Sequence, residues 1–159
     1  MKRIEINLGT QALTLFDGAD IEREYPVSTA LNGPGESLGS GRTPRGRHVI
    51  RAMIGRDMPI NTVFVGRRPT GESYNAALHA KHPQRDWILT RILWLSGCER
   101  GFNRLGNVDT MRRYIYIHGS PDVAKMGQPG SHGCIRMHNL NVVDLFERVR
   151  PGTSVLIVE

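Results

Sequence analysis

The chain has 159 residues, of which 39% are hydrophobic and 23% charged, as is typical of a soluble globular protein. This length predicts a single domain over residues 1–159. Lysine and arginine outnumber aspartate and glutamate by 21 to 15, a net charge of +6, but no block of like charges and no basic stretch interleaved with aromatic residues points to nucleic acid. No apolar run approaches the ~20 residues of a membrane-spanning helix. We therefore expect neither nucleic acid nor a membrane as a partner.

Turn-forming residues are frequent, with 18 glycines and 9 prolines, and they favour a mainly β fold with few long helices. Alternation of apolar and polar residues gives the strands of the first half. These predicted strands cover residues 4–8, 12–16, 21–27, 47–51 and 61–66. The first two form a hairpin, and a long loop rich in glycine and proline occupies residues 29–46.

The second half of the chain mixes strands with two short helices. Residues 72–82 predict a helix that ends at Pro83. Helical spacing of apolar residues predicts another that starts at Asn139 or Asn141 and ends near Val149. Further strands are predicted at residues 87–95, 114–118 and 154–158.

The strand at 114–118 alternates tyrosine with isoleucine, so Tyr114 and Tyr116 share one face. This face either lines a cleft beside His118 or packs with its hydroxyl groups satisfied. The loop at 119–130 contains glycine and proline, and it is either a lid over the cleft or a plain connection.

Two tryptophans and two arginine pairs have ordinary readings. We expect Trp87 and Trp94 to lie in the core, because large aromatic side chains stabilise it most. The adjacent Arg67 and Arg68, like the pair Arg112 and Arg113, are interpreted as solvated surface charge.

The N-terminus bears on location, and the two cysteines bear on redox state. Residues 1–8 are basic but lack the apolar segment of a signal peptide, and they read directly as a strand. We expect a cytoplasmic protein, or a periplasmic one if an export signal has been removed. In a reducing cytoplasm a disulfide between Cys98 and Cys134 is not expected, and Cys98 is interpreted as incidental.

The segment 131–136, Ser-His-Gly-Cys-Ile-Arg, is the most informative pattern in the sequence. The thiolate of Cys134 can attack a carbonyl carbon while the imidazole of His118 takes and returns the proton. Gly133 leaves room for that carbonyl and for backbone N–H groups that face the developing oxyanion. Arg136 offers a planar cation that can hold a carboxylate. The pattern predicts a site for cysteine acyl transfer.

Segments 43–46 (Thr-Pro-Arg-Gly), 116–119 (Tyr-Ile-His-Gly) and 131–136 together resemble the L,D-transpeptidase catalytic domain family of the YkuD type. The N-terminal hairpin, which runs into residues 25–28, is also similar to the family's opening strands. The resemblance extends over roughly residues 4–158. It implies a mainly β, single-domain sandwich or distorted barrel with one or two short helices, and a cysteine on a loop over the sheet.

The resemblance also implies the roles of individual residues. Cys134 would be the nucleophile and His118 the base that later acts as the acid, with the backbone carbonyl of Gly119 orienting the imidazole. The N–H groups of Gly133 and Cys134 are candidates for the oxyanion hole. Pairing with an imidazolium would lower the thiol pKa. The residues expected around the substrate and its oxyanion are Ser131, His132, Gly133, Arg136 and Tyr116.

The activity implied by the resemblance is acyl transfer on peptidoglycan stem tetrapeptides, without a cofactor. The cysteine would attack the carbonyl at the L-centre of the third residue, usually diaminopimelate, and expel the terminal D-Ala. The acyl group then passes to an amine, which forms a 3-3 crosslink or exchanges the D-amino acid, or to water. For a cytoplasmic enzyme that meets soluble muropeptides during recycling, water is the favoured acceptor, which makes it an L,D-carboxypeptidase. Carbapenem β-lactams are expected inhibitors.

Three readings of other classes compete with this one. His132, Cys134 and His138, with His118, offer nitrogen and sulfur ligands for zinc, although paired ligand knuckles are missing. In the second alternative, the chain is a module that binds D-peptides or β-lactams without catalysis. Nucleic-acid binding rests on net charge alone.

Overall fold

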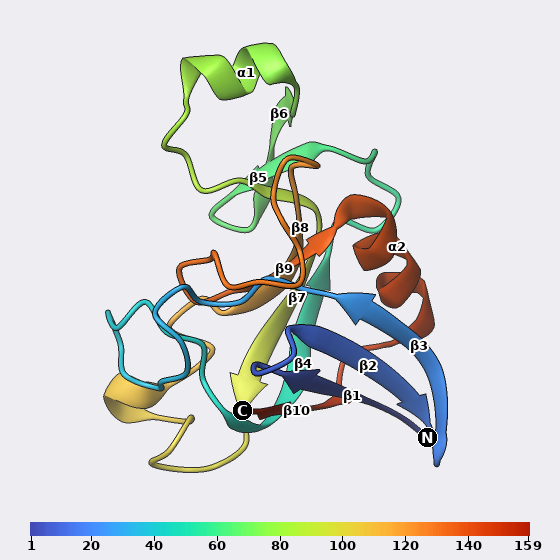
Figure 1. Ribbon diagram of the computed structural model, residues 1–159, viewed down its shortest axis with the longest axis vertical. Helices are drawn as coiled ribbons and strands as arrows, with labels where there is room; N and C mark the ends of the chain where they lie inside the picture. Colours follow the sequence, from blue (N-terminus) through green and yellow to red (C-terminus); the bar gives the residue numbers. More distant parts are fainter.

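The computed structural model describes residues 1–159 and arranges them around one curled sheet of ten strands (Figure 1). The strand-rich core of the molecule carries two short helices and one 3₁₀ turn. In chain order the elements are β1 (Lys2–Asn7), β2 (Ala12–Asp17), β3 (Asp20–Pro26), β4 (Gly46–Ile54), β5 (Thr62–Val65), β6 (Arg68–Ser73), α1 (Ala76–Lys81), β7 (Ile88–Gly97), η1 (Gly106–Val108), β8 (Tyr116–Ser120), β9 (Ile135–His138), α2 (Asn139–Arg148) and β10 (Ser154–Val158). The mainly β fold with one or two short helices is confirmed.

The sheet joins the two ends of the chain near its middle. Its strand order is β3-β2-β1-β10-β4-β7-β5-β6, with β8 paired to β7 and β9 paired to β8. The first and last strands run parallel, so that Ile4 lies opposite Val155. Strand β7 pairs with β4, β5 and β8, which makes it the branch point of the sheet. Through this branch, the sheet fixes β8 and β9, which flank the cysteine motif.

The main core lies between the sheet and α2. In β1 the alternate residues Ile4 and Ile6 are buried, as expected for a strand with one face on the core. Helix α2 buries a single stripe, formed by Val142, Leu145 and Phe146, and packs against β7, β8 and β9. The helix therefore supports β8, which carries His118, and β9, which follows Cys134.

The segment predicted as one helix at 72–82 is instead a strand followed by a shorter helix. Strand β6 extends to Ser73, and α1 begins only at Ala76. Asn75 sets this boundary, because its side-chain oxygen accepts the backbone N–H of Leu78 at 2.8 Å. In Figure 1, α1 and β6 stand at one end of the molecule, and both termini lie toward the other.

Two strand boundaries near the motif also differ from the prediction. Strand β8 begins at Tyr116, because Tyr114 has a φ of 56° that a continuing strand cannot accommodate. Strand β9 was not predicted, since four residues directly after a glycine-rich motif give too short a pattern. It pairs in parallel with β8, with Ile117 opposite Ile135.

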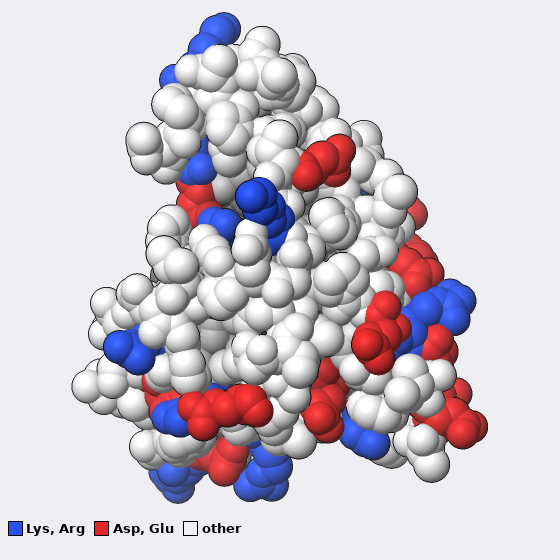
Figure 2. All heavy atoms as spheres, in the orientation of Figure 1, with Lys and Arg blue, Asp and Glu red and all other residues white.

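Surface charges are mixed. Figure 2 shows basic and acidic side chains next to each other, most of them toward the lower and right-hand edges of one face and others above its centre, with uncharged surface between. Several are paired, such as Glu22 with both Lys2 at 3.1 Å and Arg148 at 2.9 Å. Neither helix has the length and apolar character needed to cross a bilayer.

Candidate active site

A pocket of about 450 Å³ opens beside Cys134. It collects residues from the β5–β6 turn, the start of β7, the approach to β8, and the cysteine motif. Two of the expected residues, Gly119 and Gly133, do not line it. Those that do are Tyr116, His118, Ser131, His132, Cys134 and Arg136. The structure thus brings six of the eight expected site residues to one hollow.

The parallel pairing of β8 and β9 places the sulfur against the start of β8. Cys134 directly precedes β9, and its Sγ accepts the backbone N–H of Tyr116 at 3.3 Å. The thiol in turn donates to the backbone carbonyl of Tyr114 at 3.3 Å. Tyr116 and His118 are two residues apart on one strand, so their side chains point to the same face. The sulfur is therefore held at the end of the strand that carries the histidine.

His118 is held in one tautomer. Its Nδ1 lies 2.6 Å from the carbonyl oxygen of Gly119, an arrangement in which Nδ1–H donates. Its Nε2 is buried and has no hydrogen-bond partner in the protein. Burial lowers the pKa of His118 below its usual value of 6.5, so the ring is neutral at pH 7. A neutral imidazole with a free, buried Nε2 can accept a proton.

The thiol is protonated in the resting site, contrary to the expectation from the sequence. Burial raises the pKa of Cys134 from 9.0 to about 12, and the N–H of Tyr116 offsets only part of this effect. A lowered thiol pKa requires an imidazolium beside the sulfur. The structure keeps His118 neutral instead, and the guanidinium groups of Arg136 and Arg113 offset only part of the effect of burial on the thiol.

The loop before Cys134 is fastened by two hydroxyl groups. Ser131 Oγ donates to the carbonyl of Cys134 at 2.6 Å and accepts the N–H of Gly133 at 3.1 Å. The buried Thr43, from the segment 43–46, donates to the carbonyl of Gly133 at 2.9 Å. Gly133 has a φ of 134°, and a Cβ there would lie 3.2 Å from Ile115 Cδ1. The glycine is needed for both reasons.

These bonds change the expected oxyanion hole. The N–H of Gly133 is already bonded to Ser131, so it is not free to bind an oxyanion. The backbone N–H of Cys134 has no partner within the protein. Of the two predicted donors, only that of Cys134 is available in this arrangement.

Arg136 is anchored beside the pocket rather than free. Its guanidinium donates to the carbonyl of Gly130 at 3.0 Å and lies 3.3 Å from Asp86. Asp86 could not be predicted as part of the site from the sequence, because it precedes β7 and lies 50 residues before Arg136. Arg113 also lines the pocket and is tied to the backbone carbonyl of Arg42 at 2.6 Å, which holds the loop at 35–42 against it.

Two interpretations of other residues need correction. Arg67 was expected to be solvated charge, but it lines the pocket, while its neighbour Arg68 is exposed as expected. Trp87 is buried in a small cluster, as predicted. Trp94 is only half-buried and lies under the guanidinium of Arg67, 5.0 Å from ring centroid to Cζ. The signal that sequence reading missed was the two-residue turn between Val65 and Arg68.

The structure does not favour the zinc alternative. No three histidine, cysteine, aspartate or glutamate side chains come together in a group that could hold a metal ion. Both Cys98 and Cys134 are free thiols, and Cys98 is exposed. Cys98 therefore has no part in the site, whereas Cys134 lines the pocket.

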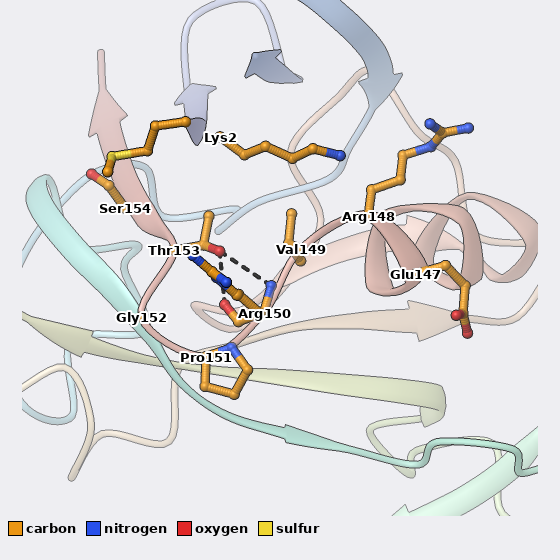
Figure 3. Close-up of a pocket in the computed structure, with 10 residues that line it drawn as sticks. Lys2, Glu147, Arg148, Val149, Arg150, Pro151, Gly152, Thr153 and Ser154 are labelled. Carbon is orange, nitrogen blue, oxygen red and sulfur yellow. Dashed lines mark hydrogen bonds between the residues drawn. The ribbon is translucent and has the colours of Figure 1, made fainter. Parts of the chain in front are cut away.

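A hollow larger than the one beside Cys134 lies elsewhere (Figure 3). It measures about 880 Å³ and lies between the N-terminal strand and the turn after α2. Figure 3 shows Thr153 bonded to the backbone of Arg150 there. The hollow is lined by no cysteine or histidine, and two of its cations, Lys2 and Arg148, are paired with Glu22. It therefore offers neither a thiol nucleophile nor an imidazole base, despite its size.

Comparison with known proteins places this geometry in a family. Residues 1–157 match the YkuD model, which describes the L,D-transpeptidase catalytic domain. The chain is 44% identical over 59 residues to YqjB of Bacillus subtilis (strain 168), covering 37% of the chain and 32% of the relative. It is 27% identical over 156 residues to YkuD of Bacillus licheniformis, covering 98% and 64% respectively. The names of both relatives assign them to the L,D-transpeptidases.

A solved structure shares the fold. L,D-transpeptidase 3 from Mycobacterium tuberculosis, in complex with a faropenem-derived adduct, has a TM-score of 0.59 at 14% identity, covering 99% of this chain and 60% of that one. The chain spans between about one third and two thirds of the length of the curated relatives it matches. Because the family model covers nearly the whole sequence, the chain belongs to the L,D-transpeptidase catalytic domain family.

Proposed function

We propose that residues 1–159 act as one catalytic domain that opens the bond between the L-centre of the third residue and the terminal D-Ala of peptidoglycan stem tetrapeptides. Cys134 is the nucleophile and His118 the base. The observation that carries this proposal is the presence of a thiol and a neutral imidazole in the lining of one pocket. The thiol is fixed between the backbones of Tyr114 and Tyr116, and the imidazole has a free Nε2.

Acylation begins with a proton transfer. The thiol hydrogen leaves the carbonyl of Tyr114 and moves to His118 Nε2 as the sulfur attacks the peptide carbonyl carbon. The oxyanion forms near the free N–H of Cys134. As the C–N bond breaks, His118 returns the proton to the departing amine of D-Ala, which leaves a thioester on the sulfur. The carbonyl of Gly119 stabilises the transient imidazolium through Nδ1–H.

Deacylation reverses these roles. His118 takes a proton from the acceptor, the acceptor attacks the thioester carbonyl, and the C–S bond breaks as the sulfur regains a proton. We propose water as the favoured acceptor, which makes the enzyme an L,D-carboxypeptidase of muropeptide recycling in the cytoplasm. The pocket of about 450 Å³ supports this choice, because it is at the lower end of the range for small-ligand sites and an acylated peptide leaves little space for a second one.

The test is mass spectrometry of disaccharide-tetrapeptide incubated with the protein, with and without D-Met as an amine acceptor. Loss of one D-Ala without D-Met exchange is the expected result. Crosslinked dimers or D-Met exchange would identify a transpeptidase instead. Cys134→Ala should abolish turnover, and His118→Ala should lower it by orders of magnitude. Cys98→Ala is the matched control, since its exposed thiol lies outside the site.

β-Lactams are the proposed inhibitors. A carbapenem should add its mass once to the wild type and to Cys98→Ala, and not at all to Cys134→Ala. Labelling of folded Cys134→Ala would show that another group is the nucleophile. Binding of the peptide without any turnover by the wild type would favour a non-catalytic binding module.

A further inference from the structure

Arg67 is the cation of the active-site pocket that has donors to spare. Three arginines line the pocket, and two of them are occupied. Arg136 bonds to a backbone carbonyl and to Asp86. Arg113 bonds to the carbonyls of Gly35 and Arg42. Arg67 makes a single hydrogen bond, from Nη1 to the hydroxyl of Tyr116 at 3.1 Å, and pairs with no carboxylate.

The backbone holds Arg67 in an unusual conformation. Gly66 and Arg67 form the two-residue turn between the paired residues Val65 and Arg68, and both have positive φ, 57° and 65°. Turns of this kind favour glycine or asparagine at such positions, and an arginine there is strained. Strained residues of this sort are concentrated at functional sites. The turn carries a large cation into the pocket where a glycine would suit the backbone better.

Aromatic rings fix the guanidinium beside the nucleophile. Its Cζ lies 4.6 Å from the ring centroid of Tyr114 and 5.0 Å from that of Trp94. Tyr114, and Tyr116 whose hydroxyl accepts from Arg67, also hold Cys134 through their backbones. A guanidinium stacked in this way loses little further freedom when it binds an anion. The remaining N–H groups of Arg67 are therefore oriented donors. Arg67 contacts Tyr116, and Tyr116 in turn contacts the sulfur of Cys134.

We propose that Arg67 binds a carboxylate of the peptide donor next to the scissile bond. The inference rests on the proposed function, which supplies a peptide with two such groups: the terminal carboxylate of D-Ala and the side-chain carboxylate of the third residue. Planar guanidinium and carboxylate groups match in a two-bond geometry. Arg67 is thereby a specificity residue for anionic donors, and it acts alongside Arg136 rather than through it.

The experiment compares kcat/KM for three donors: the free acid, the D-Ala amide, and the peptide amidated on the third residue. Arg67→Ala and Arg67→Gly should lower kcat/KM for the free acid by about 10- to 100-fold, the range of a charge-assisted hydrogen bond. Glycine suits the positive φ, so it keeps the turn while removing the cation. Arg68→Ala, on the exposed neighbour, should match the wild type.

The amides identify the carboxylate. One of the two amides lacks the carboxylate that Arg67 binds. The wild type should turn over this amide as slowly as the Arg67→Gly variant turns over the free acid. Its kcat/KM should not change further when Arg67 is replaced by glycine. Full dependence on Arg67 for both amides would overturn the proposal, as would an Arg67→Gly variant as active as the wild type.

A binding measurement separates this proposal from the proposed function. Calorimetry in a Cys134→Ala background should show that the free acid binds and that Arg67→Gly weakens its affinity by the same factor. If the wild type turns over no peptide but this dependence is present, the proposed function fails and the carboxylate site stands. Equal affinity with and without Arg67 would overturn the site whatever the turnover.

Discussion

At the scale of single residues, the chemistry of the site depends on the protonation states of Cys134 and His118 before substrate binds. His118 is buried and Cys134 is half-buried. Desolvation shifts their two pKa values in opposite directions, toward a neutral thiol and a neutral ring. An ion pair would need stabilisation that the site does not provide at rest. The thiolate therefore forms only as the carbonyl carbon is attacked, which couples proton transfer to bond formation.

The neutral resting thiol predicts how the reactivity of Cys134 depends on pH. In a Cys98→Ser background, alkylation of Cys134 by iodoacetamide should rise about tenfold per pH unit through neutrality, because the thiolate fraction grows until pH reaches the raised pKa. Turnover should fall only below pH 6.5, where the lowered pKa of His118 allows its protonation. An alkylation rate that stays constant from acid to neutral pH would instead reveal a resting ion pair.

At the scale of secondary-structure elements, a bulge in β7 supports the histidine. The pairing of β7 with β8 skips from Leu89 opposite Gly119 to Ile92 opposite His118, so Thr90 is one of two extra residues in β7 at this point. Thr90 is fully buried with a φ of 73°, a strained conformation for a branched side chain. A Cβ on Gly119 would lie 2.6 Å from the carbonyl oxygen of Leu89, so the two strands meet closely here.

The hydroxyl of Thr90 ties the bulge to α2. It donates to Asn139 Oδ1 at 2.7 Å and accepts the backbone N–H of Asn61 at 3.1 Å. Asn139 Nδ2 completes the network with a bond to Asn61 Oδ1 at 3.0 Å. The network packs behind Gly119, whose carbonyl fixes the His118 ring. We interpret it as a positioning network, because none of its three residues lines the pocket.

Replacing Thr90 tests this role. Thr90→Val keeps the shape but leaves Asn61 N–H and Asn139 Oδ1 without their partner, which should cost about 1–3 kcal/mol in the free energy of unfolding. Turnover should fall through kcat more than through KM, because the base is misplaced while the pocket is intact. Thr90→Ser is the control, since it retains the hydroxyl and should approach the wild type in both measurements. A Thr90→Val enzyme with wild-type kcat would remove the bulge from the mechanism.

Local pattern explains which elements could be predicted from the sequence. The alternation of Ile4 and Ile6 was enough for β1, because one face of the strand is buried. Strand β9 could not be predicted, since its four residues are set by pairing with β8. The roles of His118 and Cys134 could be predicted from the sequence. Their protonation states could not, because these depend on burial, which only the folded structure shows. Arg67 reaches the pocket through a turn 49 residues before Tyr116.

At the scale of the whole molecule, the C-terminal strand holds the sheet together. β10 lies between β1 and β4, so it is an interior strand although it is the last to be made. Its alternate residues Val155 and Ile157 are buried in the main core. Without β10, the strands β1 to β3 would be joined to the rest of the sheet only by the isolated bridge between Ser28 and Arg136. β10 pairs with β4, β4 pairs with β7, and β7 pairs with the strand of His118.

A charge on the buried face of this strand should therefore unfold the entire molecule. Val155→Asp places an unpaired carboxylate in the core, a change of the class that exceeds about 4 kcal/mol, against a total stability of about 5–15 kcal/mol for a domain. Urea unfolding followed by circular dichroism should show a large fall in midpoint, or no folded baseline. Leu156→Asp, on the opposite, half-exposed face of the same strand, should cost far less. If both variants unfold at the same urea concentration, β10 is not the strand that couples the two parts of the sheet. If only Val155→Asp unfolds and the loss is cooperative, the site and the N-terminal hairpin share one folding unit.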